Sequence, residues 1–175
     1  MFEIQPHNPE HYRSQTRRST LIIALIFLAL AMLLSTAAVT LFGEPGGDNL
    51  RFNVGGVFVA VLLMAALMRS TFWHQQWMAA AVYGWQLKRS LMSITNVMHQ
   101  VTAAVEHNDP SAMKLLRFYH LGLHQMHQLD GNSSDQSQLI REMDQHQARM
   151  EALGMATDQM RLDPAWLEAL KQAQR

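Results

Sequence analysis

Two long apolar runs dominate the first half of the chain. Residues 21–42 contain no charged side chain, and as a helix they would be about 33 Å long, enough to cross a bilayer. Residues 52–68 form a second run, in which Asn53 is the only strongly polar side chain. The Gly, Pro, Asp and Asn residues at 43–49 are typical of a turn. The pattern therefore predicts a transmembrane helical hairpin.

Lysine and arginine residues predict the orientation of this hairpin, because they gather in the cytoplasmic loops of membrane proteins. Positive side chains flank the open side of the hairpin at Arg13, Arg17, Arg18, Arg69, Lys88 and Arg89, whereas the tip carries only Arg51. We therefore expect the hairpin to lie in the bacterial inner membrane with both termini in the cytoplasm.

A rival interpretation is an export signal, because residues 16–21 faintly resemble a twin-arginine signal. However, the apolar run is longer than that of a signal peptide and lacks a clean cleavage site of small residues. A second apolar run also follows it. Membrane anchoring is therefore the favoured interpretation.

Small residues indicate how the two spans pack. Gly56 and Ala60 are four residues apart, and we expect them to meet Ala31 and Ser35 of the first run. Packing within the hairpin is favoured over self-association. Neither run contains Asp, Glu, Lys, Arg or His, so a transport pathway would need residues from a partner.

Beyond the hairpin, apolar residues recur every four and three residues from Trp73 to Val105, which predicts one long helix of coiled-coil character. The second span either continues straight into this helix or kinks at residues 70–71. The half nearest the membrane, residues 73–87, has surplus apolar surface, which suggests a partner or the lipid surface. Trp73, Trp77 and Trp85 suggest contact with lipid headgroups.

Three further helices are predicted after this one. Asp109 and Pro110 are typical of a helix start, and Gly131 of an end, for a helix over about 110–129. Ser133 and Gln136 have the spacing of a capping box for the next helix. Its apolar face comprises Leu139, Met143, His146, Met150 and Leu153, and a short terminal helix after Asp163-Pro164 buries Trp166, Leu167 and Leu170.

The sequence therefore predicts an all-α protein, with a two-helix transmembrane hairpin followed by a small antiparallel cytoplasmic helical bundle. We expect a cytoplasmic N-terminal tail at 1–18 and the hairpin at 19–72, with spans at about 20–42 and 51–70. The cytoplasmic bundle then occupies residues 73–175.

Composition excludes several classes of protein. Lys and Arg number 14 and are balanced by 14 Asp and Glu, which argues against a nucleic-acid-binding protein. The chain has no cysteine, so disulfides, thiolate metal sites and a cysteine nucleophile are excluded. We find no motif for phosphate binding, for a nucleophilic serine, for zinc hydrolysis or for calcium. The sequence assigns no catalytic, cofactor-binding or metal-binding residue, and we expect no enzymatic activity.

The chain contains 9 histidines, which is a high number. His120, His124 and His127 share one face of a helix, but the outer two are about 10 Å apart along its axis and cannot share one ion. Antiparallel helices would instead bring His99, His120 and His146 to one level, where they could hold Zn²⁺, Cu or the edge of a haem. A structural role is favoured, because no Asp or Glu lies on the apolar faces to orient the rings.

Two stretches of the sequence resemble a known family. Residues 83–88 (Tyr-Gly-Trp-Gln-Leu-Lys) and 118–125 (Phe-Tyr-His-Leu-Gly-Leu-His-Gln), with Leu129-Asp130 after them and Tyr12-Arg13 before the first span, resemble an uncharacterised family of proteobacterial inner-membrane proteins. The resemblance covers roughly residues 12–153. It implies a two-span anchor and a cytoplasmic helical domain, and it carries no activity, cofactor or catalytic residue. The family's pattern does not include the histidines at 120, 124 and 127.

These observations favour a non-enzymatic accessory or scaffold subunit that presents a cytoplasmic helical bundle to a membrane partner or to a second copy of itself. The alternative is a metal- or haem-binding regulatory protein that uses His99, His120 and His146.

Overall fold

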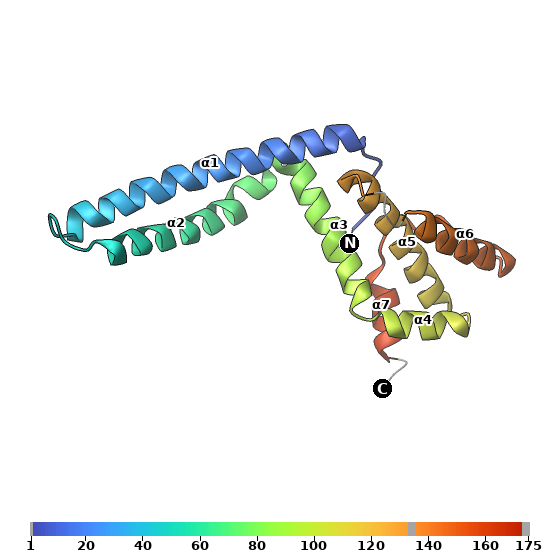
Figure 1. The fold of residues 1–175 in the computed structure, drawn as a ribbon. Coiled ribbons are helices and arrows are strands. Elements are labelled where there is room, and N and C mark those ends of the chain that lie inside the picture. Colours follow the sequence, from blue (N-terminus) through green and yellow to red (C-terminus); the bar gives the residue numbers. More distant parts are fainter. Residues whose placement is uncertain (1, 133–135, 173–175) are drawn as a thin grey trace. The chain divides into compact units, whose positions relative to one another are not determined.

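The computed structural model describes residues 2–132 and 136–172 (Figure 1). Apart from one isolated β-bridge, the regular elements in these ranges are helical, so the predicted all-α fold is confirmed. The chain forms two compact units. Unit 1 joins Met1–Arg13 to Tyr83–Arg175, and unit 2 is Ser14–Val82.

Unit 2 is a helical hairpin made by α1 (Pro9–Phe42), which begins in unit 1, and α2 (Leu50–Ser70) (Figure 1). The predicted contact between small residues is confirmed for Gly56. A Cβ atom on this residue would lie 2.5 Å from Cα of Ser35, whose hydroxyl donates to the Asn53 carbonyl at 3.0 Å. Ala60 is fully buried as well. The missing side chain at residue 56 therefore lets the two backbones approach closely.

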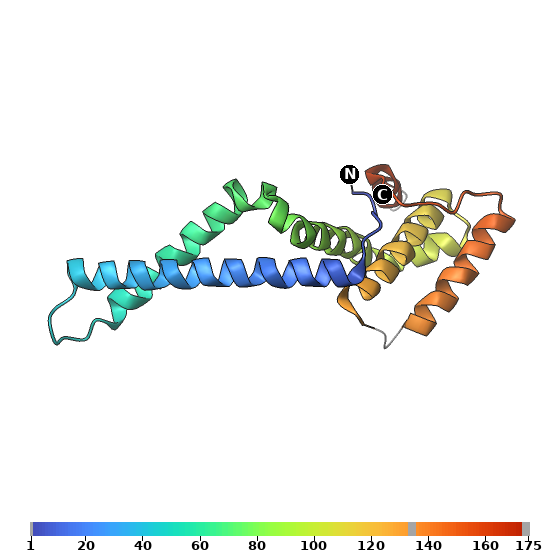
Figure 2. The same cartoon turned by 90° about the horizontal axis from the view of Figure 1, so that it is seen from above.

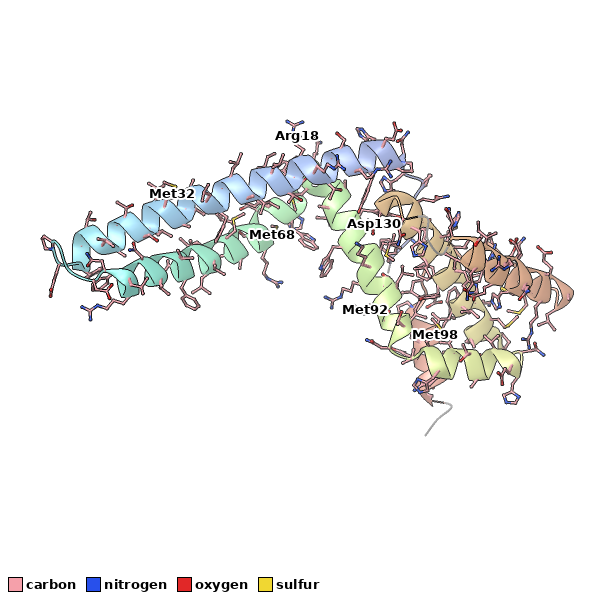
Figure 3. All side chains as sticks on the ribbon, in the orientation of Figure 1. Arg18, Met32, Met68, Met92, Met98 and Asp130 are labelled. Carbon is pink, nitrogen blue, oxygen red and sulfur yellow. The ribbon has the colours of Figure 1, made fainter. Side chains whose placement is uncertain are left out.

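Away from this contact, the hairpin exposes large apolar side chains, which project from both helices in Figure 3. Two helices, Pro9–Phe42 and Leu50–His74, are long and apolar enough to span a membrane. The most apolar stretch of the first is entirely unburied within the structure. Such exposure is unfavourable in water, so the hairpin indicates association with a membrane.

The predicted long helix from Trp73 to Val105 is wrong, because the chain is interrupted at residues 71–78 and again at 96–97. The helix α2 ends at Ser70, and two short 3₁₀ turns, η1 (Phe72–His74) and η2 (Gln76–Met78), come before α3 (Ala79–Thr95). A second interruption at 96–97 separates α3 from α4 (Met98–Glu106). Of the two predicted connections to the second span, the kink is the one observed.

Local hydrogen bonds account for these breaks. The Ser70 hydroxyl donates to the Ala66 carbonyl at 2.8 Å, and the Thr95 hydroxyl donates to the Leu91 carbonyl at 3.1 Å. Side chains that bond to the carbonyl one turn back weaken or bend the helix at that point. The apolar spacing nevertheless continues across the break, because Ile94 and Val101 are both fully buried. The apolar spacing therefore indicates which residues are buried, and it does not indicate that they belong to one continuous helix.

In unit 1, α5 (Pro110–Asp130) packs against α4, α6 (Gln136–Ala152) and α7 (Pro164–Gln172). Its predicted ends are confirmed. The Asp109 carboxylate accepts the Ala112 amide at 2.8 Å, and Gly131 ends the helix in the left-handed conformation with φ of 70°. Half of the predicted capping box, Ser133, lies outside the described residues.

The predicted apolar faces of α6 and α7 are largely observed. Leu139, His146, Met150 and Leu170 are buried, and Met143, Trp166 and Leu167 are half-buried. Leu153 is an exception, being 46% exposed and beyond the end of α6. The chain turns away there at Gly154, which has a positive φ of 67°. A residue with this conformation ends the helix before residue 153 can follow its period.

The N-terminal residues, which the sequence analysis treats as a tail, pack in unit 1 against the connection between α6 and α7 (Figure 2). The Ile4 amide donates to the Met160 carbonyl at 2.8 Å, and the Leu162 amide donates to the Phe2 carbonyl at 2.9 Å. These bonds form the isolated antiparallel bridge between Glu3 and Arg161. Ile4 is buried, so this segment contributes to the core of the bundle.

Candidate functional site

A cavity of about 470 Å³ lies among α4, α5 and α6, and we call it the histidine cavity. Its lining combines two imidazoles with one carboxylate, one guanidinium and several polar or apolar side chains. The lining residues are Met98, Thr102, Leu116, Tyr119, His120, Glu142, Gln145, His146 and Arg149. The packing of α5 against α4 and α6 brings these residues together, as the sequence predicts for His120 and His146.

His120 and His146 form a buried pair at the base of this site. Their ring centroids are 5.5 Å apart with planes at 80°, and each residue is 6% exposed. The Nε2 atom of His146 lies 2.9 Å from the Met113 carbonyl oxygen. Because a carbonyl oxygen only accepts, Nε2 carries the proton and Nδ1 of the neutral ring keeps its lone pair. The Nδ1 atom of His120 is buried without a partner among the described residues.

Both imidazoles are held in the neutral form. Burial lowers the pKa of His120 to about 4, with a further decrease from His146 and an opposing effect of Glu142. Burial also lowers the pKa of His146, against the hydrogen bond to Met113, which raises it. At neutral pH the pair therefore offers lone pairs and ring edges, and no positive charge.

Arg117 is a buried cation next to this pair that the sequence analysis did not single out. Its guanidinium donates to the Thr157 carbonyl at 2.9 Å, to the Met143 carbonyl at 3.3 Å and to the Gln147 side-chain oxygen at 2.7 Å. These hydrogen bonds link α5 to α6 and to the segment before α7. Its position four residues after Met113 and three before His120, on the buried face, is the signal that could have identified it.

The predicted convergence of three histidines is wrong for one of them. His99 is exposed and does not line the cavity, because the break at residues 96–97 redirects α4. His124 lies on α5 with its Nε2 atom 2.9 Å from the Gln128 amide nitrogen. Across residues 2–132 and 136–172, no group of three or more His, Cys, Asp or Glu could hold a metal ion. The three-histidine metal site of the hypothesis therefore lacks its third ligand in the part of the chain that the structure describes.

A second polar cluster, which we call the Tyr83 cluster, comprises Tyr83, Gln5 and Gln125. The Tyr83 hydroxyl accepts from the Gln5 amide at 3.0 Å and donates to the side-chain oxygen of Gln125. The Gln125 amide nitrogen donates in turn to the Gln5 carbonyl. Three segments far apart in the sequence are thus linked around one hydroxyl, whose pKa burial raises.

The Tyr83 cluster includes residues of the two stretches on which the family resemblance rests. Tyr12, from before the first span, contacts the backbone of α3 at Gly84. A Cβ atom on Gly122 would lie 2.9 Å from a methyl group of Leu91 and 3.6 Å from a methyl group of Ile4, so these side chains pack closely against this glycine. The shared residues therefore join the N-terminal segment, α3 and α5.

A family model described as "Protein of unknown function (DUF3087)" matches residues 2–167. The match covers both candidate spans, the histidine cavity and the Tyr83 cluster. No curated protein and no solved structure matches the chain.

Proposed function

Because the chain belongs to the DUF3087 family, whose description assigns no activity, we propose a role for it from its fold. We propose that it is an integral protein of the bacterial inner membrane and a non-enzymatic accessory subunit. It would present its cytoplasmic helical unit to a membrane protein partner or to a second copy of itself.

One observation carries the membrane part of this proposal, namely the apolar surface of the hairpin. Leu21, Leu25, Leu28, Met32 and Leu33 are among the large side chains exposed along α1, and Phe58 and Leu62 are exposed on α2. The chain itself does not bury this apolar surface. The lipid interior is the environment whose polarity matches it.

The composition of unit 1 supports the proposed topology. This unit contains both the chain that precedes the first span, up to Arg13, and the chain that follows Val82. Because both flanking segments belong to the same compact unit, this grouping supports the proposal that both flanks of the hairpin lie on one side of the membrane. The positive side chains on these flanks, against the single Arg51 at the tip, favour the cytoplasm for that side.

A scaffold role is supported by what the histidine cavity offers. Its two imidazoles are neutral and one is already bonded to the Met113 carbonyl. The cavity residues belong to the packing between α4, α5 and α6, whereas apolar side chains such as Ile140 and Leu153 remain exposed on the surface of the unit. Those outer side chains are available to a partner.

The experiment begins with the full chain in native membranes. Extraction with alkaline carbonate should leave the protein in the membrane pellet, and reporters fused to either terminus should report the cytoplasm. Purification in mild detergent with native mass spectrometry should then reveal either a second copy or one stoichiometric membrane protein. A carbonate-soluble protein would contradict the anchor. A monomer without partner would contradict the accessory role while leaving the anchor intact.

The metal- or haem-binding regulator remains the alternative function, and elemental analysis of the same preparation tests it. We expect no stoichiometric transition metal and no haem absorption band. Metal bound in a ratio that falls with His120→Ala and His146→Ala, but not with His99→Ala, would replace our proposal with a regulatory one.

A further inference from the structure

A second cavity of about 310 Å³ opens on the surface of unit 1 beside α3. Three apolar residues, Phe2, Leu162 and Pro164, form one part of its lining. The remaining lining comes from Trp85 and Arg89 of α3 together with two polar neighbours. We call this the Trp85 cavity.

The polar side of the Trp85 cavity consists of hydrogen-bond donors. Arg89 contributes a guanidinium group, Gln86 an amide and Ser90 a hydroxyl, and no lining residue is acidic. The nearest charged residue on the same helix, Lys88, is paired with Asp130 at 3.1 Å and does not line the cavity. The Asp163 carboxylate, just before Pro164, is bonded to the Ala165 amide at 2.9 Å. Donors without a carboxylate match an anion such as a phosphate group.

The apolar side of the cavity continues onto the outer face of α3. The Arg89 guanidinium lies over the Trp85 ring, 5.1 Å from its centroid, and Trp85 is 47% exposed. Met92, two turns along the same face, is 65% exposed and projects from α3 in Figure 3. An exposed indole combined with a cation and an unbranched apolar side chain is typical of the boundary between headgroups and acyl chains.

Continuity of the chain keeps this face within reach of a bilayer. The helix α3 begins at Ala79, after two short turns that follow the end of α2 at Ser70. Trp85 is then less than two helical turns, about 9 Å, beyond that start. The chain between the end of the span near Ser70 and Trp85 is therefore short enough for Trp85 and Arg89 to reach the headgroups.

We propose that the Trp85 cavity binds the phosphate group of an anionic membrane phospholipid. Arg89, Gln86 and Ser90 bind the phosphate oxygens, while Trp85 and Met92 contact the upper acyl chain. This inference rests on the proposed membrane anchor. It goes further by assigning a lipid class and a binding site to the cytoplasmic unit.

The test uses the full chain in nanodiscs of phosphatidylcholine alone or of phosphatidylcholine with phosphatidylglycerol. Lipids brominated near the headgroup quench nearby indoles, and the difference between the wild type and Trp85→Phe isolates the Trp85 signal. We expect Trp85 to be quenched and blue-shifted when the brominated lipid is phosphatidylglycerol. We expect Arg89→Ala to abolish most of this anion-dependent quenching.

Lys88→Ala is the matched control, because it removes the adjacent positive charge without touching the lining of the cavity. It should leave the Trp85 signal nearly unchanged. Equal losses for Arg89→Ala and Lys88→Ala would replace a specific site with general electrostatic attraction, and would overturn the proposal.

Two further outcomes would also overturn it. Equal quenching in both kinds of nanodisc would exclude recognition of the anionic headgroup. Displacement of the brominated lipid from Trp85 by inorganic phosphate at millimolar concentration would indicate a soluble anion as the occupant. Because incorporation into the nanodisc is measured separately, a failure of this site is distinguishable from a failure of the membrane anchor.

Discussion

The hydroxyl of Tyr12 fills the space that a Cβ atom on residue 84 would occupy. Gly84 is buried in α3, and an ideal Cβ atom built there would overlap the Tyr12 Oη atom. A glycine within a helix costs about 1 kcal/mol relative to alanine. At this position the absence of a side chain instead lets Tyr12 pack directly against the backbone of α3.

Replacing Gly84 by alanine should therefore destabilise unit 1 by about 1–3 kcal/mol, because the overlap outweighs the gain in helix propensity. The measurement is the thermal unfolding midpoint of the detergent-solubilised protein. Tyr12→Phe removes the overlapping oxygen and should recover part of the loss when combined with Gly84→Ala. Additive effects of the two changes would contradict a direct contact.

The adjacent glycines of α2 provide a comparison within the hairpin. A Cβ atom on Gly56 would lie 2.5 Å from Cα of Ser35, whereas one on Gly55 would meet no atom within 4 Å. Gly56→Ala should separate the two spans at a cost of about 1–3 kcal/mol, and Gly55→Ala should not.

The lack of natural cysteine makes this hairpin prediction easy to measure. The substitutions Ser35→Cys and Asn53→Cys would introduce the only thiols, at positions where the Ser35 hydroxyl lies 3.0 Å from the main-chain carbonyl oxygen of Asn53. We expect Gly56→Ala to slow their oxidative cross-linking several-fold. Equal rates for the Gly55 and Gly56 variants would argue against the close contact.

The buried histidine pair predicts a dependence of stability on pH. The pKa of His120 falls from 6.5 to about 4 on folding, so the unfolded chain binds the proton more tightly than the folded chain. The contribution of His120 to the free energy of unfolding is therefore fully present above pH 6.5, and it is lost as the pH falls through about 4. The loss attributable to His120 is on the order of 3 kcal/mol.

Denaturant unfolding across this pH range measures the effect. His120→Asn should flatten the decrease in stability, since asparagine does not take up a proton. His99→Asn, at an exposed position, is the matched control and should leave the decrease in place. A profile that is identical in the wild type and His120→Asn would mean that other groups cause the acid sensitivity.

The Tyr83 cluster predicts what holds the N-terminal segment on the bundle. Gln125→Leu removes a hydrogen bond to the Gln5 carbonyl and one from the Tyr83 hydroxyl. We expect a loss of about 1–3 kcal/mol and faster amide hydrogen exchange at residues 2–7. Gln138→Leu, which removes only the exposed bond to Glu142 at 2.8 Å, should change neither. Unchanged exchange in the Gln125 variant would show that the segment is held without Gln125, by Ile4, the backbone bonds and the bond between Gln5 and Tyr83.

Features carried by local chemistry could be predicted from the sequence. The cap at Asp109, the left-handed end at Gly131 and the contact at Gly56 each follow from one residue type at one position. The neighbouring positions of His120 and His146 also followed, because a short connection makes α5 and α6 antiparallel and sets their register.

Features that depend on contacts between distant segments could not be predicted. An unbroken apolar spacing concealed the interruption at residues 96–97, since Ile94 and Val101 are buried on both sides of it. Because of that interruption, His99 does not line the histidine cavity with His120 and His146. The packing of Ile4 depends on backbone bonds to Met160, and a backbone bond leaves no signature in the side chains that form it.

The pairing of Ile4 with Met160 has a consequence for the order in which this protein matures. The two bonded segments are separated in the sequence by the whole hairpin and most of the bundle. A very long loop must therefore close before the bonds form. On the ribosome, both candidate spans emerge well before residue 160 is synthesised. Under the proposed membrane anchor, insertion would therefore precede completion of unit 1, and the N-terminal segment would pair with residues 160–162 only after the membrane topology is set.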